Sequence, residues 1–330
     1  MLRGPRIVAL AWVAATCGWA ASDRIASIDF YGYGSLDPSA LRALLPFHEG
    51  DPLPSDRLNA QARAALQRTS GRSAVEISPV LGAGGWTLYI GLAEPDAPPL
   101  KFNPHPTANL KLPPDVLKLF DRMDKDWLDA IKSGTAEEDD SAGYAVSKDS
   151  DTRGDQLKLR DWAQTHTATL LRVLETSAHI DQRQRAAEAV AYSGHSPQQI
   201  SALVRAASDA DAGVRNASLR ALAVLCVLGP EITRQIPGAR FVPLLHSLHW
   251  TDRNKTSMLF RRLTDTPDPA LLDVLRERAL DPLREMMRWK DKGHAYPGAT
   301  LLGRIAGLPD ARTNELFEAG KLDEILDALR

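Results

Sequence analysis

The sequence has little cysteine, no excess of either charge and no long apolar run. Cys17 and Cys226 are its two thiols in 330 residues, and 40 basic side chains face 42 acidic ones for a net charge of −2. The first feature excludes a disulfide framework and a zinc site built on cysteines. The second disfavours a nucleic-acid duplex as partner. No apolar run beyond residue 21 reaches the roughly 18–20 residues that span a bilayer. With 44% apolar residues, the chain is expected to be a soluble protein with a sizeable core.

The first twenty residues predict an export signal. Two arginines precede an uncharged apolar stretch over 7–21, and Gly18 and Ala20 supply the small side chains of a cleavage site. We expect cleavage after Ala20, which removes residues 1–20 and changes the net charge to −4. A lipid anchor on Cys17 is the alternative, although the residues before it depart from the usual lipid-modification pattern. The product would be a periplasmic or secreted bacterial protein with Cys226 as a buried thiol.

Residues 22–94 predict a small α+β domain, because period-two patterns alternate with helical ones. The expected elements are a strand at 25–32, a helix from Asp37, a helix over 55–68, and strands at 75–77 and 86–90. The last two strands flank the glycine-rich segment 82–85, which is typical of a hairpin turn and not of a phosphate loop leading into a helix.

This segment resembles the polypeptide-transport-associated (POTRA) module of outer-membrane assembly and secretion proteins. The matching parts are the opening strand 25–32, the helix start Leu36-Asp37-Pro38, the bend Glu49-Gly50-Asp51 and the closing segment 88–94. The resemblance implies a βααββ domain that binds partners, often by adding a strand along its sheet edge. Family members usually carry tandem copies, whereas one copy is recognised here. An unrelated α+β domain with the same order of elements is the alternative.

The segments that follow are a linker and an acidic loop. Residues 95–114 contain seven prolines, which exclude a helix and predict an extended linker or strap. Residues 115–156 predict one helix followed by the acidic run Glu137–Asp140. We expect that run to be a solvated loop, because it lacks the alternating pattern of a calcium-binding EF-hand. Ser141 beside it has no base assigned by any motif, so we do not expect a nucleophile there.

Residues 157–330 predict helices and no strand. Residues 181–191 align with 213–223, so that Arg183 falls on Arg215 at a separation of 32. A period of this length is typical of stacked helical units. Further helices are expected at 240–249, 253–264, 268–290, 297–307 and 313–328.

The unit over 200–225 resembles a HEAT repeat and related bilin-lyase-type repeats. The signature residues are Asp209 and Asp211 in the turn, Val214, Arg215, Ala217, Ala221 and Leu222 in the second helix, and Arg183 and Ala189 in the preceding unit. The resemblance implies a solenoid of stacked helix pairs. In such a unit we expect the turn aspartates to accept hydrogen bonds from the next helix, the arginine to reach neighbouring turns, and the alanines to allow close helix packing.

Three histidines are weak candidates for a site. His246 and His249 stand three residues apart near Trp250, but no third metal ligand is evident, so we expect them to cap a helix end. His294 is expected to pack with Trp289 and Tyr296 where two helices meet. We therefore expect no metal, no cofactor and no catalytic residue.

The leading functional hypothesis is an exported scaffold that binds another protein or a peptide through the solenoid and the POTRA-like domain, without catalysis. One alternative is an enzyme, either a hydrolase or a bilin-lyase-type lyase, with its site in the solenoid groove near the three histidines. Another is an accessory component of outer-membrane assembly or secretion machinery.

Overall fold

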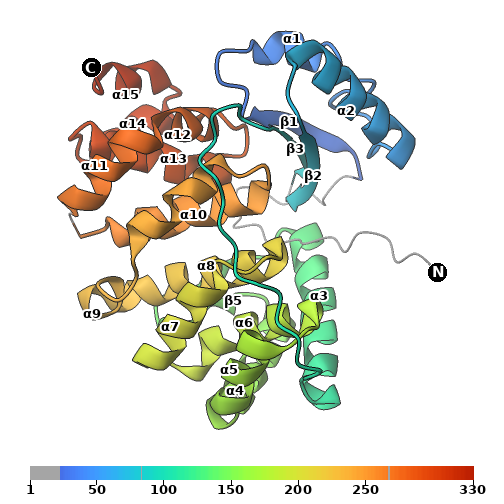
Figure 1. Cartoon of the computed structure of the whole chain (residues 1–330), viewed down its shortest axis with the longest axis vertical. Coiled ribbons are helices and arrows are strands. Elements are labelled where there is room, and N and C mark those ends of the chain that lie inside the picture. Colours follow the sequence, from blue (N-terminus) through green and yellow to red (C-terminus); the bar gives the residue numbers. More distant parts are fainter. Residues whose placement is uncertain (1–22, 83, 267) are drawn as a thin grey trace.

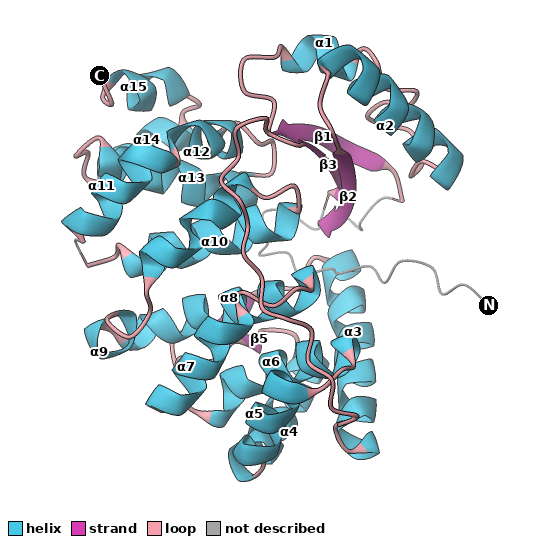
Figure 2. Cartoon of the chain, viewed as in Figure 1, coloured by secondary structure: helices cyan, strands magenta, loops and turns pink. Residues whose placement is uncertain are grey.

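The computed structural model describes residues 23–82, 84–266 and 268–330. The predicted signal segment 1–20 lies outside these residues. A three-stranded sheet with two helices comes first, and helices form nearly all of the rest (Figures 1 and 2). This order confirms the predicted α+β segment followed by a helical one. None of the described helices is both long enough and apolar enough to cross a membrane.

The sheet consists of β1 (Ile25–Tyr31), β2 (Val75–Gly82) and β3 (Gly85–Leu92) in the order β1-β3-β2. Strand β3 pairs parallel with β1 and antiparallel with β2. Helices α1 (Pro38–Arg42) and α2 (Asp56–Ser70) form a common core with the sheet. Asp37 caps α1, as the sequence predicts, by accepting a hydrogen bond from the backbone N–H of Ser39.

The two faces of the sheet differ in chemistry, because successive side chains of a strand point to opposite sides. The face toward α1 and α2 is apolar and buries Ile28, Phe30, Leu88, Ile90 and Leu92. The other face carries polar and aromatic side chains, namely Ser27, Asp29, Tyr31, Thr87 and Tyr89. All of these are buried as well, because this second face packs against the helical part of the chain.

The helical part contains the following elements: α3 (Pro114–Ser133), α4 (Ser150–Thr165), α5 (Thr167–Thr176), α6 (Ile180–Ser193), α7 (Pro197–Ala206), α8 (Ala212–Leu225), α9 (Pro230–Thr233), α10 (Trp250–Leu263), α11 (Pro269–Arg278), α12 (Leu280–Met287), α13 (Lys292–Ile305), α14 (Asp310–Glu318), α15 (Leu322–Asp327), and the 3₁₀ segments η1 (Cys226–Leu228) and η2 (Gly238–His246). Helices α4, α6, α8, α10 and α13 pack one against the next in a row. Helices α5 and α7 and segment η2 pack on α6, α8 and α10, respectively. Cys226 is buried beside this row, and burial raises the pKa of its thiol to about 12.

Four predicted helices have different bounds in the structure. The helix expected at 297–307 already begins at Lys292, because Asp291 caps it there, and Pro297 lies inside it. The helix expected at 268–290 is divided at Ala279, because the ring of Pro282 would clash with the carbonyl of Arg278 in a continuous helix. The helix expected at 313–328 is interrupted at Gly320, which adopts a φ of 69°. The segment expected as a helix at 240–249 is the 3₁₀ segment η2, which contains Pro243.

The proline-rich strap runs extended across the ends of the helical row (Figure 1). The backbone N–H of Asn103 bonds to the carbonyl of Ser208 at 2.7 Å. Farther along, Ala108 forms a parallel bridge with Ser177. The ring of Phe102 lies 4.2 Å from the guanidinium carbon of Arg215. The strap therefore fastens the turns between successive helices.

Three buried arginines occupy equivalent positions near the starts of α6, α8 and α10. Arg183, Arg215 and Arg253 each donate a hydrogen bond to the carbonyl six residues earlier. Arg183 also pairs with Asp209 at 2.9 Å, and Arg215 pairs with Asp252 at 2.7 Å. In the same turn Asp211 accepts the N–H groups of Gly213 and Val214 at the start of the next helix, as expected of a turn aspartate, whereas Asp209 accepts from the guanidinium of Arg183 in the preceding unit. We call these three side chains the arginine ladder.

Replacing one member of the arginine ladder should be strongly destabilising. We expect Arg215→Met to lower the free energy of unfolding by about 3–5 kcal/mol, because Asp252 would remain buried without a counter-charge. Urea unfolding followed by circular dichroism measures the change. The matched control is Arg284→Met, which removes an exposed pair with Asp281 and should cost less than about 1 kcal/mol. Equal effects of the two substitutions would contradict a structural role for the ladder.

Candidate functional site

An aromatic cluster joins the polar face of the sheet to the helices. The ring of Tyr89 stacks on Trp250 with centroids 4.7 Å apart, and the ring of Trp289 meets Tyr89 edge-on at 4.9 Å. The hydroxyl of Tyr31 donates to the carbonyl of Leu248 at 2.7 Å. The sheet is therefore held by directional contacts as well as by burial.

His294 belongs to this cluster. Its Nδ1 lies 2.6 Å from the hydroxyl of Tyr89, and its ring meets Trp250 edge-on at 5.0 Å. Of the two residues expected to pack with His294, Trp289 belongs to the same cluster through the Tyr89 ring, whereas Tyr296 packs against Phe317. Burial lowers the pKa of His294, so its imidazole is neutral at pH 7. Its Nε2 has no hydrogen-bond partner among the described residues.

His246 and His249 both reach across to the sheet. His246 also bonds to the last carbonyl of α11 (Pro269–Arg278), so it caps a helix end as expected, whereas the His249 side chain makes no capping hydrogen bond. His246 Nδ1 lies 2.6 Å from Glu94 at the end of β3, and its Nε2 lies 2.7 Å from the carbonyl of Arg278. Two acceptors require both ring nitrogens to carry protons. Burial alone would lower the pKa of His246, but the hydrogen bond and charge of Glu94 outweigh burial and raise it. His249 occupies the N-cap position of α10. Its side chain does not bond to that helix, because its Nδ1 pairs with Glu76 of β2 at 2.7 Å.

Arg253 and Glu285 make further contacts between the helical part and the sheet. The guanidinium of Arg253 bonds to Glu94 and lies 4.8 Å from the centre of the Tyr31 ring. Glu285 accepts the backbone N–H groups of Gly32 at 2.6 Å and Gly34 at 2.8 Å, just after β1. Gly32 has a φ of 69°, and a Cβ there would lie 2.0 Å from the carbonyl oxygen of Leu92. Only glycine fits this turn, which points its N–H toward the carboxylate.

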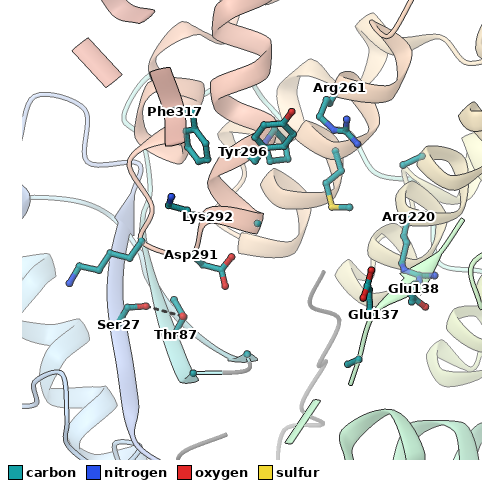
Figure 3. Close-up of a pocket in the computed structure, with 18 of the residues that line it drawn as sticks. Ser27, Thr87, Glu137, Glu138, Arg220, Arg261, Asp291, Lys292, Tyr296 and Phe317 are labelled. Atoms are coloured by element: carbon teal, nitrogen blue, oxygen red, sulfur yellow. Dashed lines mark hydrogen bonds and ion pairs between the residues drawn. The ribbon is translucent and has the colours of Figure 1, made fainter. Parts of the chain in front are cut away.

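The docked sheet and helices enclose two clefts. Cleft 1 has a volume of about 1070 Å³ and lies between the hairpin end of the sheet, residues 136–140 and helices α8, α10, α13 and α14 (Figure 3). Cleft 2 has a volume of about 580 Å³ and lies between α3, α4, α6, α8 and the other side of the hairpin. Neither cleft is lined by His246, His249 or His294.

A buried ion pair separates the clefts. Glu138 of β4 (Glu138–Asp139) pairs with Arg220 of α8, and both residues line both clefts. Asp140 pairs with Arg262 of α10 at 2.8 Å. The expectation of a solvated acidic loop is therefore wrong for these two residues. Strand β4 pairs with β5 (Val146–Ser147), and helix-borne arginines fix the segment across the groove.

The described residues contain no group of three or more histidine, cysteine, aspartate or glutamate side chains arranged to hold a metal ion. The predicted repeat residues lie in the helical core and its turns: Ala189, Val214, Ala217, Ala221 and Leu222 are buried apolar positions. They shape the helical row and carry no chemistry of their own. No model of a known protein family matches the sequence, and no curated protein is found as a relative.

The contact between His246 and Glu94 predicts a pH dependence of stability. Since the folded state raises the pKa of His246, the stabilisation is fully present below the unfolded value of about 6.5 and is lost as the pH rises through the higher folded value. We expect His246→Gln to cost about 1–2 kcal/mol of unfolding free energy at pH 6 and less than half of that at pH 8.5.

Urea unfolding at the two pH values measures this difference. His249→Gln is the matched control, because its side chain is 48% exposed and its ion pair should be worth less than about 1 kcal/mol. A loss for His246→Gln that stays the same or grows toward pH 8.5 would contradict a charged His246.

Proposed function

We propose that the protein is an exported scaffold in which a HEAT-like solenoid carries a POTRA-like domain and binds a segment of another protein. The arginine ladder supports the repeat assignment. Arg183, Arg215 and Arg253 make the same backbone contact in three successive units, although their spacing changes from 32 to 38 residues. Repetition of a tertiary contact is expected of stacked helical units.

The sheet edges favour binding in a groove over binding by strand addition. Along β1, the outer backbone groups of Ile25 bond to residues 50 and 51, and those of Ile28 bond to Glu49 and Arg42. Along β2, Pro79 cannot donate a hydrogen bond to an added strand. A partner strand would therefore meet an occupied edge or an interrupted one.

Cleft 2 has the chemistry of a peptide groove. Aromatic and aliphatic side chains line it: Leu81, Trp86, Phe120, Met123, Trp127 and Leu128. Six carboxylates but only three basic side chains accompany them. Arg185 is already paired with Asp124 and Glu188, and Arg220 with Glu138. The exposed carboxylates of Asp121 and Asp181 are left facing the groove.

The single observation that carries this proposal is the acidic rim around an apolar floor in cleft 2. An apolar floor gives affinity through burial, and uncompensated carboxylates select basic side chains. The occupant is thus a partner segment in which apolar and basic residues alternate. The scaffold needs no catalytic group for this role.

A defined peptide tests the proposal. The probe is a ten-residue peptide of alternating leucine and lysine, and binding to the full chain is measured by fluorescence anisotropy. We expect the double substitution Asp121→Asn, Asp181→Asn to weaken binding about fivefold, since each rim charge contributes about 0.5 kcal/mol. Raising the salt concentration should weaken wild-type binding in the same direction.

The controls separate charge selection from general adhesion. Asp161→Asn removes an exposed carboxylate of α4 outside the cleft and should leave binding unchanged. A matched peptide with glutamate in place of lysine should bind far more weakly. The proposal fails if the glutamate peptide binds equally well, or if the rim substitutions have no more effect than Asp161→Asn.

A further inference from the structure

Cleft 1 contains charged side chains that are nearly all neutralised within the described structure. The pairs at its walls are Arg220 with Glu138, Arg262 with Asp140, Lys292 with Glu318, and Lys290 with Glu49. Asp291 caps α13 by accepting the N–H of His294 at 3.0 Å. These charged groups are therefore already bonded to other residues of the protein, and their pairs connect the walls of the cleft.

Arg261 is the exception among the described residues of this cleft. No described carboxylate lies within 4.0 Å of its guanidinium, and no hydrogen bond from the guanidinium to a described residue is present. The guanidinium carbon lies 5.8 Å from the centre of the Tyr296 ring. Burial and the neighbouring Arg262 lower the pKa of Arg261. The lowered pKa means that the protein surroundings disfavour the positive charge of this guanidinium.

The surroundings of Arg261 are apolar on one side. Met258, Tyr296 and Phe317 line the cleft with it, and Figure 3 shows Arg261, Tyr296 and Phe317 along the same wall. The rings of Tyr296 and Phe317 pack with centroids 5.7 Å apart. A cation next to an apolar wall in a large cleft suits a ligand with one anionic end and an apolar body.

We propose that cleft 1 binds a monocarboxylate with an apolar body, its carboxylate on Arg261 and its body against Met258, Tyr296 and Phe317. A guanidinium offers a carboxylate two parallel N–H donors. Asp140 and Asp291 line the same cleft and would repel a phosphate dianion more strongly than a single negative charge. This ligand goes beyond the proposed function, because that function uses cleft 2.

Three probes test the site by isothermal titration calorimetry on the full chain. They are octanoate, an N-acetylated tripeptide of leucine, valine and phenylalanine with a free carboxyl end, and the same tripeptide amidated. At least one of the two carboxylates should bind, and the amide should bind at least about tenfold more weakly than the free tripeptide if that tripeptide binds. Binding of octanoate alone identifies a fatty-acid-like ligand, and binding of the free tripeptide identifies a peptide carboxyl end.

Substitutions assign the binding to Arg261. Arg261→Gln should weaken carboxylate binding by about tenfold or more, and Arg261→Lys should weaken it less because the charge remains. The matched control is Arg172→Gln, an exposed position of α5 outside both clefts, which should bind as the wild type does. The inference is overturned if neither carboxylate binds, if the amide binds as tightly as the free tripeptide, or if Arg261→Gln binds as the wild type does. The result is independent of the rim substitutions in cleft 2.

Discussion

The contact that the rest of the structure depends on is made by Arg253. In the two units before it, the arginine pairs with an acid of the next helical unit: Arg183 with Asp209, and Arg215 with Asp252. Arg253 instead bonds to Glu94 of the sheet segment and lies 3.6 Å from Glu285. At the following equivalent position stands Ala295, where no arginine can continue the ladder. The sheet thus supplies the carboxylate at the place where the helical series changes, and the fully buried guanidinium of Arg253 would lose its closest carboxylate if the sheet moved away.

The sequence predicts the elements of this arrangement better than their contacts. The alternation in β1 and β3 correctly indicates strands, but Ser27, Asp29 and Thr87 have the polarity of a solvent face and are nevertheless buried. Their burial follows from partners far along the chain, such as the N–H of Lys290, which bonds to Asp29 across 261 positions. The repeat alignment did not include Arg253, because the spacing from Arg215 to Arg253 is six residues longer than the spacing from Arg183 to Arg215. The clefts escaped prediction because each combines the hairpin, several helices and the segment around Glu138.

A polar docking face makes the position of the sheet specific and also sensitive to protonation. Burial raises the pKa of Asp29 to about 6, so the folded state holds that proton more tightly than the unfolded chain does. The contribution of Asp29 therefore declines as the pH rises toward 6, and that of His246 declines at higher pH. His294 acts in the opposite direction, because its burial favours the neutral form and is penalised as the pH falls below about 6.5. The stability of the docked state is therefore the sum of opposing pH dependences from Asp29, His246 and His294. Substituting one of these residues changes how the stability varies with pH.

Both clefts take part of their lining from the docked sheet, so a ligand that contacts the sheet as well as the helices is coupled to the position of the sheet. Cleft 1 takes Ser27 and Thr87 from the sheet and Arg261 and Tyr296 from the helices (Figure 3). Cleft 2 takes Leu81 and Trp86 from the sheet and Phe120 from α3. A ligand that touches both walls binds the docked state and not an undocked one, so it stabilises docking by mass action. The same linkage runs in reverse, because a change that weakens the contacts of Arg253 or His246 reduces the fraction of molecules with a docked sheet and lowers the apparent affinity by that fraction. A ligand that also contacts the sheet would therefore have an affinity that follows the pH response of docking, even though none of His246, His249 and His294 lines a cleft.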